Sequence, residues 1–251
     1  MAHEDHDEDI KRLADGHENA ERGMLRAIIG MLRGSTTFRA AEAILDAIAG
    51  TLGLASEQWT ADVVPRIYAD GMRTAQDALG EAVDLTPHSA PLELLRQDLT
   101  DDLAALTEQM SRDAKSKLRQ IARRQASQMM ATGSNAIPQA REMEKEMVEE
   151  GVAFTDRGGR RWKPRAYSEL VLRTKAVEVS NEANVNTARQ LGSAAMRIFD
   201  GGPGDVDEPC RVANGQVWSA EYFAAHLLEH PHCRRAGAPL PSTYAGKVDR
   251  A

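Results

Sequence analysis

The sequence has few cysteines, few aromatic residues and no long apolar segment, and each shortage argues against a class of protein. Only two of the 251 residues are cysteine, too few for a secreted scaffold held by disulfides. Aromatic residues make up 4% of the chain, which disfavours a β-sandwich. The apolar stretch Ala27 to Leu32 is far shorter than the ~20 residues that span a bilayer, and the first residues are acidic. We therefore expect no membrane contact and no signal peptide.

Motifs of common catalytic sites are also missing. The chain has no phosphate-binding Gly-x-x-x-x-Gly-Lys-Ser/Thr, no Gly-x-Ser-x-Gly, no His-Glu-x-x-His, and no deaminase pairing of His-x-Glu with Cys-x-x-Cys. No nucleophile is therefore specified together with its base. We expect a protein that is not an enzyme.

What the chain does contain is the composition of a folded, mildly acidic, helical protein. Lys and Arg number 31 against 38 Asp and Glu, a formal charge of −7, and 42% of the residues are hydrophobic. Apolar residues recur every three or four positions through the first 150 residues. This spacing predicts helices over 7–33, 36–52, 56–82, 91–130 and 137–150, with a start or kink at Pro65. Residues 1–150 therefore read as an elongated helical bundle.

The pattern changes after Gly151. The segments 152–155 and 161–162 flank Gly158-Gly159 and predict a small β-hairpin, and Pro164 opens a helix that ends at Gly192. A strand over 196–199 follows, and then short strands, loops and one short helix around 222–228. The predicted fold class is mainly α, with an N-terminal bundle (1–150) and a small α+β module (151–251).

Cysteine and histidine gather near the C-terminus and form the strongest chemical cluster. Its members are Cys210, His226, His230, His232 and Cys233. Thiolate and imidazole are the ligand types that Zn²⁺ prefers, so Cys210, His230 and Cys233 are candidate metal ligands. A disulfide between the cysteines, or reduced thiols packed as small apolar groups, fits the spacing as well. His3 and His6 lie in a terminal segment without fixed geometry, and we expect no metal there.

Basic residues form two groups. Arg112, Lys115, Arg119 and Arg123 share one face of a predicted helix, and Arg157, Arg160, Arg161, Lys163 and Arg165 surround the hairpin. Contact with phosphate is one interpretation. The negative total charge and the lack of a nucleic-acid motif favour a solvated or protein-facing surface.

Three residues are predicted structural anchors rather than catalytic groups. Arg173 lies in an apolar stretch of the predicted helix, so its guanidinium needs carboxylate or carbonyl partners. The acids of the loop that follows, at positions 200, 205, 207 and 208, are available for this. Trp162 and Tyr167 are the other two anchors, at the hairpin and at the start of the helix.

A series of short motifs runs through residues 154–239. They are Phe154-Thr155-Asp156, Gly158-Gly159-Arg160-Arg161-Trp162, Tyr167 to Thr174, Asn181-Glu182, Thr187 to Gly192, Asp207-Glu208-Pro209-Cys210, Asn214-Gly215-Gln216-Val217 and His230-Pro231-His232-Cys233-Arg234. In their order and spacing these words resemble the tailed-phage minor capsid, or Mu F-like head morphogenesis, family. They cover roughly a third of the chain. The helical stretch Val64 to Gly71 suits the minor capsid subfamily.

The chain departs from that family at two positions. Members often carry two further cysteines, where this chain has Ala213 and Arg235. Two of four potential zinc ligands are therefore absent. If the two cysteines that are missing here form one pair in the family and the two that remain form another, Cys210 would lie close to Cys233.

The resemblance implies a structural role in the virion. Such proteins enter the prohead in few copies, inside the capsid near the portal vertex, after assembly in the host cytoplasm. The expected partner is the portal, the major capsid protein or both, with the helical bundle over 1–150 serving in assembly or portal docking. Packaged DNA is a candidate further contact. One alternative is a metal-dependent nuclease or toxin-like effector built on the Cys/His module. Another is a scaffold or head-tail adaptor protein.

Overall fold

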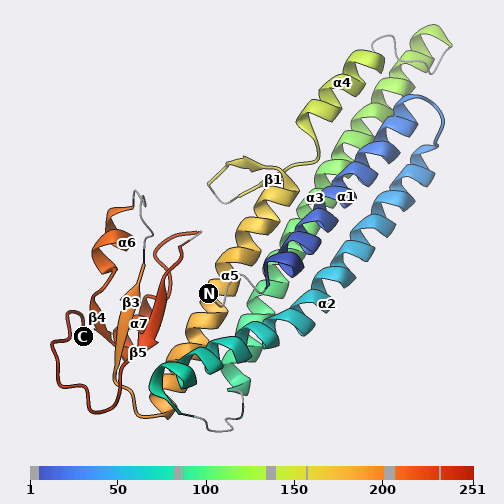
Figure 1. Cartoon of the computed structure of the whole chain (residues 1–251). Helices are drawn as coiled ribbons and strands as arrows, with labels where there is room; N and C mark the ends of the chain where they lie inside the picture. Colours follow the sequence, from blue (N-terminus) through green and yellow to red (C-terminus); the bar gives the residue numbers. More distant parts are fainter. Residues whose placement is uncertain are drawn as a thin grey trace. The chain divides into compact units, whose positions relative to one another are not determined.

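The structure, a computed structural model, describes residues 6–81, 86, 88–133, 140–156, 158–200, 207–231 and 233–251. It is mainly α with a small C-terminal α+β region, which confirms the predicted fold class (Figure 1). The helices are α1 (Asp7–Leu32), α2 (Phe38–Leu79), α3 (Ser89–Thr132), α4 (Ala140–Glu150), α5 (Pro164–Gln190), α6 (Glu208–Ala213) and α7 (Ala220–Ala225). The strands are β1 (Phe154–Thr155), β2 (Arg161–Trp162), β3 (Ala195–Phe199), β4 (Val217–Ser219) and β5 (Ala236–Pro239).

Residue contacts divide the chain into two compact units. The hairpin unit comprises Lys11–Gln58 and Thr100–Glu169. The sheet unit comprises Met1–Ile10, Trp59–Leu99 and Leu170–Ala251. Helices α1, α2, α3 and α5 each contribute residues to both units. The predicted division into residues 1–150 and 151–251 stays a prediction.

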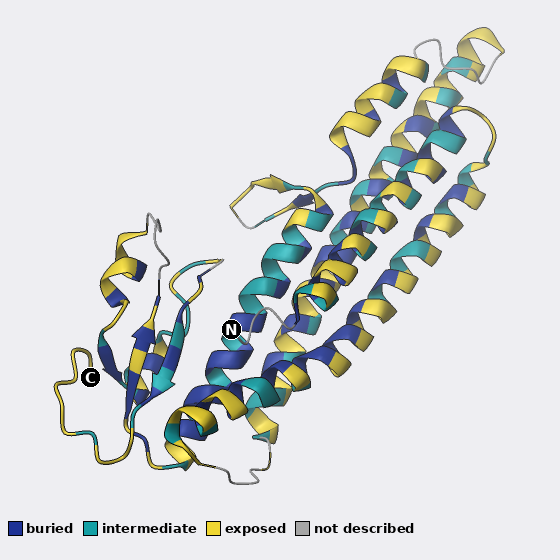
Figure 2. Cartoon of the chain, viewed as in Figure 1, coloured by how far each residue is buried: buried dark blue, intermediate teal, exposed yellow. Residues whose placement is uncertain are grey.

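The hairpin unit is a helical bundle with one continuous apolar core. Parts of α1, α2 and α3 run side by side, and α4 packs against this group (Figure 1). Met24 and Ile28 of α1, Leu45 of α2 and Leu118 of α3 are fully buried, which leaves the charged positions of the same helices facing solvent (Figure 2). The three- and four-residue spacing of the sequence therefore places one apolar face of each helix in a shared core.

The β-hairpin lies in the same unit and is antiparallel, as predicted. Phe154 pairs with Trp162, and Gly159 takes a positive φ of 80° in the turn between them. Such a φ suits glycine, which has no Cβ to clash with the backbone. The aromatic rings then join the hairpin to α5, because Phe154 stacks on Tyr167 with ring centroids 4.0 Å apart.

The break expected between the helices predicted over 36–52 and 56–82 was wrong, because residues 38–79 form the single helix α2, which contains Gly53 and Pro65. A glycine costs a helix only about 1 kcal/mol relative to alanine, and an internal proline about 3 kcal/mol. Within the sheet unit, Val64, Ile67 and Tyr68 are buried around Pro65. Burial of such side chains contributes about 1.5–3 kcal/mol each, which is enough to offset the proline.

The sheet unit contains a three-stranded antiparallel sheet in the order β4-β3-β5. Its core joins the end of α5 to the sheet and to α7 through Val185, Ile198, Trp218 and Phe223. The strand predicted at 196–199 is confirmed as β3. One expectation was wrong here: two short helices, α6 and α7, lie in the described C-terminal region, where a single one was expected.

Across the described residues, no helix combines the length and the apolar character that crossing a membrane requires.

Candidate metal and thiol site

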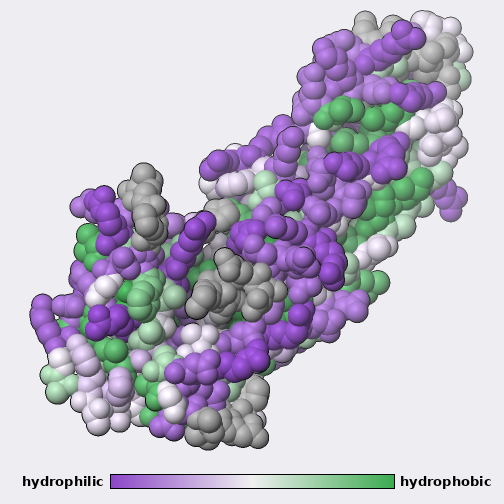
Figure 3. Space-filling model, in the orientation of Figure 1, coloured by the Kyte–Doolittle hydropathy of each residue, from purple (hydrophilic) through white to green (hydrophobic). Residues whose placement is uncertain are grey.

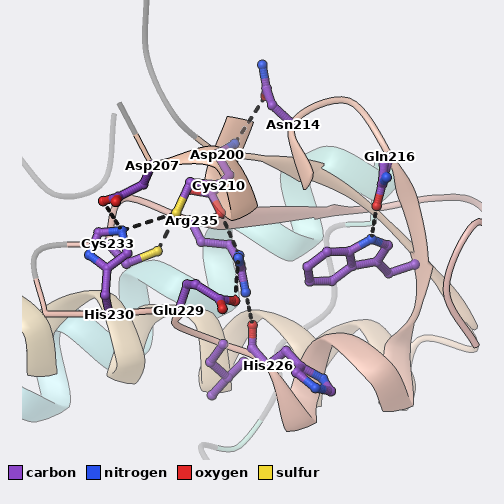
Figure 4. A network of polar contacts seen from close by, with 12 residues as sticks. Asp200, Asp207, Cys210, Asn214, Gln216, His226, Glu229, His230, Cys233 and Arg235 are labelled. Atoms are coloured by element: carbon purple, nitrogen blue, oxygen red, sulfur yellow. Dashed lines mark hydrogen bonds and ion pairs between the residues drawn. The ribbon is translucent and has the colours of Figure 1, made fainter. Parts of the chain in front are cut away.

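Cys210, His230 and Cys233 come together in the sheet unit, as Figure 4 shows. Cys210 lies on α6, and the other two lie in the loop between α7 and β5. Their Sγ and ring nitrogen atoms all lie within 4.8 Å of one another. The expectation that Cys210 lies close to Cys233 is therefore confirmed, and both cysteines are free thiols in this structure.

Cys210 lies on the short helix α6. Pro209 lies in its first turn, where the missing N–H costs nothing, and Asp207 is the N-cap residue, although its side chain makes no capping hydrogen bond. The short helix then buries Cys210 and Ala213 on one side.

The ring of His230 is oriented by the backbone. Nδ1 lies 2.7 Å from the carbonyl oxygen of Pro231, which can only accept, so Nδ1 carries a hydrogen. The other nitrogen, Nε2, lies 3.2 Å from Cys210 Sγ and 3.0 Å from Asp207 Oδ2. A neutral ring presents the Nε2 lone pair to the thiols, and a protonated ring donates to Asp207. This is the arrangement by which a backbone carbonyl fixes a metal-ligating histidine.

A buried ion pair lies directly beside the thiols. Arg235 Nε donates to Asp200 Oδ2 at 2.7 Å, and Asp200 Oδ1 lies 3.7 Å from Cys233 Sγ. Arg235 also donates to the carbonyl of His226 at 2.8 Å and lies over the Trp218 ring, 4.9 Å from its centroid. Burial is the largest single influence and lowers the pKa of Arg235, but the hydrogen bond and charge of Asp200, with smaller contributions from Cys233 and Glu229, together outweigh it, so the pKa is raised. The guanidinium is therefore a permanent charge within the site.

The Cys210 thiol is held in its neutral form. Burial, followed by the negative charges of Cys233 and Asp200, raises the pKa of Cys210 to about 12. A reactive cysteine has a lowered pKa, so this thiol is not prepared for nucleophilic attack.

The donor set fits a zinc ion. Zinc–sulfur and zinc–nitrogen bonds of about 2.3 and 2.0 Å place tetrahedral ligand atoms roughly 3.5–3.8 Å apart, and the three donors need only small shifts to reach this. The carboxylate of Asp207 lies 3.0 Å from His230 Nε2 but is not one of the three mutually close donors, so it would have to shift to become a fourth ligand. Binding would remove the two thiol protons. A metal and a disulfide both stay predictions.

The remaining histidines of the cluster do not join the three donors within the described residues. The His226 ring stacks on Tyr222 with centroids 4.0 Å apart. His3 and His232 lie outside the described residues. His6, for which no metal was expected, contacts Asp70 through Nε2 at 2.8 Å.

The predicted anchors all make structural contacts. Arg173 Nη1 donates to Asp7 Oδ1 at 2.6 Å, so this contact joins α5 to the first turn of α1, whereas its partner was expected among the acids of the loop after β3. Trp162 Nε1 donates to Asp156 Oδ2 at 2.8 Å, and its ring meets Tyr167 edge-on at 5.9 Å.

The first basic group is divided by the structure. Lys115 pairs with Asp46 of α2 at 2.5 Å, whereas Arg112 lines a cavity next to the hairpin. Arg119 and Arg123 are exposed. Sequence reasoning noted Arg235 only as the residue in place of a family cysteine, and it missed the contact of Arg235 with Asp200 beside the thiols.

Comparison with known proteins adds no relative. No protein-family model, no curated protein and no solved structure matches this chain.

Proposed function

We propose that this chain is a non-enzymatic minor capsid protein of a tailed phage, present in few copies inside the head near the portal vertex. It binds the portal or the major capsid protein and aids head assembly or DNA delivery. The observation that carries the proposal is the ordered set of sequence words between residues 154 and 239, together with the use that the fold makes of them.

Several of these words supply the internal framework of the C-terminal region. Asn181 donates to the carbonyl oxygens of Leu227 and Arg235, at 3.2 and 2.8 Å. Phe154 and Tyr167 stack where the hairpin meets α5, and Cys210 contacts His230. These contacts give several of the words a structural use in this fold, and this supports the proposal.

The chemistry of the thiols favours binding over reaction. The Cys210 pKa, raised to about 12, keeps that thiol neutral near pH 7, and the Nδ1 proton of His230 is already given to a carbonyl. Neither group is arranged as an activated nucleophile with its base.

The helices offer surface for partners. Hydrophilic side chains dominate the face in Figure 3, with smaller hydrophobic patches between them. Leu54 of α2, Leu94 of α3 and Met130 of α3 are large apolar side chains exposed to solvent. Burying such a side chain against a partner contributes about 1.5–3 kcal/mol, so these positions are candidate docking points.

Mass spectrometry of purified proheads and virions from the phage that encodes the chain tests the proposal. We expect the chain in both, at a copy number near that of the portal and far below that of the major capsid protein. Purified chain mixed with portal should co-elute from a sizing column. Absence from both particles would overturn the proposal, and a copy number near that of the capsid protein would favour the scaffold alternative.

The Cys-His-Cys group supports a second proposal, a zinc-binding module. Cys210, His230 and Cys233 would hold the ion, with Asp207 completing the set, and the bound ion would cross-link α6 to the loop before β5. Metal analysis of the purified protein, together with Cys233→Ser, tests this. One zinc per chain that is lost in the variant supports it, and zinc-dependent cleavage of DNA would favour the nuclease or toxin-like alternative.

A further inference from the structure

A polar cavity lies in the hairpin unit between α3 and the hairpin. Its volume is about 530 Å³, within the range of small-ligand sites. The lining consists of Gln109, Arg112, Asp113, Lys117, Ala153, Thr155 and Arg161. The two basic groups of the sequence therefore meet here, since Arg112 belongs to the first and Arg161 to the second.

The cavity lining has more positive than negative charge. Three cationic side chains, Arg112, Lys117 and Arg161, face one carboxylate, Asp113. Asp113 Oδ2 already accepts from the backbone N–H of Ala153 at 3.2 Å and lies 4.0 Å from Lys117 Nζ. Asp113, the single carboxylate of the lining, is thus already hydrogen-bonded to Ala153 and paired with Lys117, and the lining has three cationic side chains against this one acid.

Two acids outside the lining pair with two of these cations. Lys117 donates to Glu150 at 2.9 Å, and this bond, followed by the charges of Lys117 and Arg161, lowers the pKa of Glu150. Lys117 is therefore held in place as a fixed charge. Arg112 pairs with Glu108 at 3.4 Å, but both side chains are 67% exposed, and such a surface pair contributes little.

Arg161 is the most available cation of the cavity. Among the residues that the structure describes, no carboxylate forms an ion pair with its guanidinium within 4.0 Å. It extends from β2 while Arg112 extends from α3, so the two guanidinium groups approach the cavity from different elements. Each can donate two parallel hydrogen bonds to one anion.

We propose that this cavity binds the phosphate group of an anionic ligand, held by Arg112 and Arg161 with Lys117 as a fixed third charge. A phosphate offers more acceptor oxygens than a carboxylate and can engage two guanidinium groups at once. The Thr155 hydroxyl and the Gln109 amide supply further donors. The lining contains no aromatic ring for stacking, so the site recognises phosphate rather than a base. The ligand is either a small phosphorylated anion or the phosphodiester backbone of a nucleic acid.

Calorimetric titration of the full chain at low ionic strength tests the proposal with four probes. These are inorganic phosphate, inorganic triphosphate, a 20-nucleotide single-stranded DNA and citrate. Arg112→Gln and Arg161→Gln remove one charge each from the cavity. Arg119→Gln and Arg123→Gln remove the same charge from exposed positions of α3 outside it and serve as matched controls. Thermal melting establishes that each variant folds.

We expect a phosphate-bearing probe to bind the wild type and each cavity variant to weaken that binding about tenfold, while each control stays within about twofold. Binding of triphosphate without DNA identifies a small ligand, and DNA binding that triphosphate displaces only weakly identifies the phosphodiester. The proposal is overturned if no phosphate probe binds, if citrate binds as tightly as triphosphate, or if the control variants weaken binding as much as the cavity variants.

Discussion

Arg235 and Asp200 form an ion pair that is closed off from solvent: Arg235 Nε lies 2.7 Å from Asp200 Oδ2, and each side chain is 1% exposed. A second carboxylate, Glu229, reaches the same guanidinium at 3.3 Å but is 42% exposed. The two acids therefore share one cation in very different surroundings.

This contrast gives a stability prediction. Asp200→Asn leaves the buried guanidinium with only the half-exposed carboxylate of Glu229, and we expect the free energy of unfolding to fall by about 3 kcal/mol. Glu229→Gln removes a half-exposed partner and should cost less than about 1 kcal/mol. Urea unfolding followed by circular dichroism measures both. Equal losses in the two variants would contradict this account.

Two glycines in α2 are predicted to respond in opposite directions to alanine. A Cβ at Gly71 would lie 2.4 Å from the carbonyl oxygen of Ser180 and 2.8 Å from Ala183 Cβ, so α2 and α5 would have to separate. We expect Gly71→Ala to lower the free energy of unfolding by about 2 kcal/mol. Gly50 has nothing within 4 Å of such a Cβ. Gly50→Ala should raise it by about 1 kcal/mol through helix propensity. Thermal melts of both variants check this. If Gly71→Ala were as stable as the wild type, the packing of α2 against α5 at Gly71 would be loose enough to accept a methyl group.

Helix spacing and turn glycines were enough to predict most of the fold, because both signals are local. The stripe of apolar residues predicted α3, Gly158-Gly159 predicted the hairpin, and Pro164 marked the start of α5. The break predicted after residue 52 was wrong for the opposite reason. Whether a helix continues past a glycine or a proline depends on what the neighbouring residues bury, and those contacts are made with distant segments.

The site was predictable only in part. Cys210, His230 and Cys233 were found because thiol and imidazole groups are rare and cluster in the sequence. The contact of Arg235 was not found, because its place at a family cysteine position does not indicate a partner, and the carboxylate that it reaches, Asp200, lies 35 positions away. In the same way, Lys115 and Arg112 share a predicted helix face, but Asp46 forms an ion pair with Lys115 and not with Arg112.

Asn181 is predicted to hold the loop before β5. Its Nδ2 donates to two carbonyl oxygens, those of Leu227 and Arg235. In Asn181→Ala both carbonyls lose this partner, and we expect a loss of about 1–3 kcal/mol in the free energy of unfolding. Amide hydrogen exchange over 233–237 should quicken as well. Asn186, which bonds the side chain of Glu182 instead of backbone, provides a control. A quickening of the same size in Asn186→Ala would argue against a specific role for Asn181.

His17 is predicted to make stability depend on pH. It is fully buried in α1, its Nδ1 bonds the carbonyl of Leu13 at 3.0 Å, and no polar atom of the described residues bonds its Nε2. Burial lowers the pKa of His17 below its ordinary value of 6.5, with the Leu13 bond opposing this. The unfolded chain therefore takes up a proton at a higher pH than the folded chain. Stability is complete above about pH 6.5 and is lost as the pH falls from there through the folded-state pKa.

His17→Met removes both the proton and the unbonded nitrogen. The Leu13 carbonyl keeps its helical backbone partner in the variant, so little is lost at neutral pH. We expect the free energy of unfolding of the wild type to drop between pH 7.5 and pH 5, and that of the variant to drop distinctly less. Urea titrations at several pH values measure the difference. If the two proteins lose stability in parallel over this range, the proton uptake lies elsewhere and His17 is not its source.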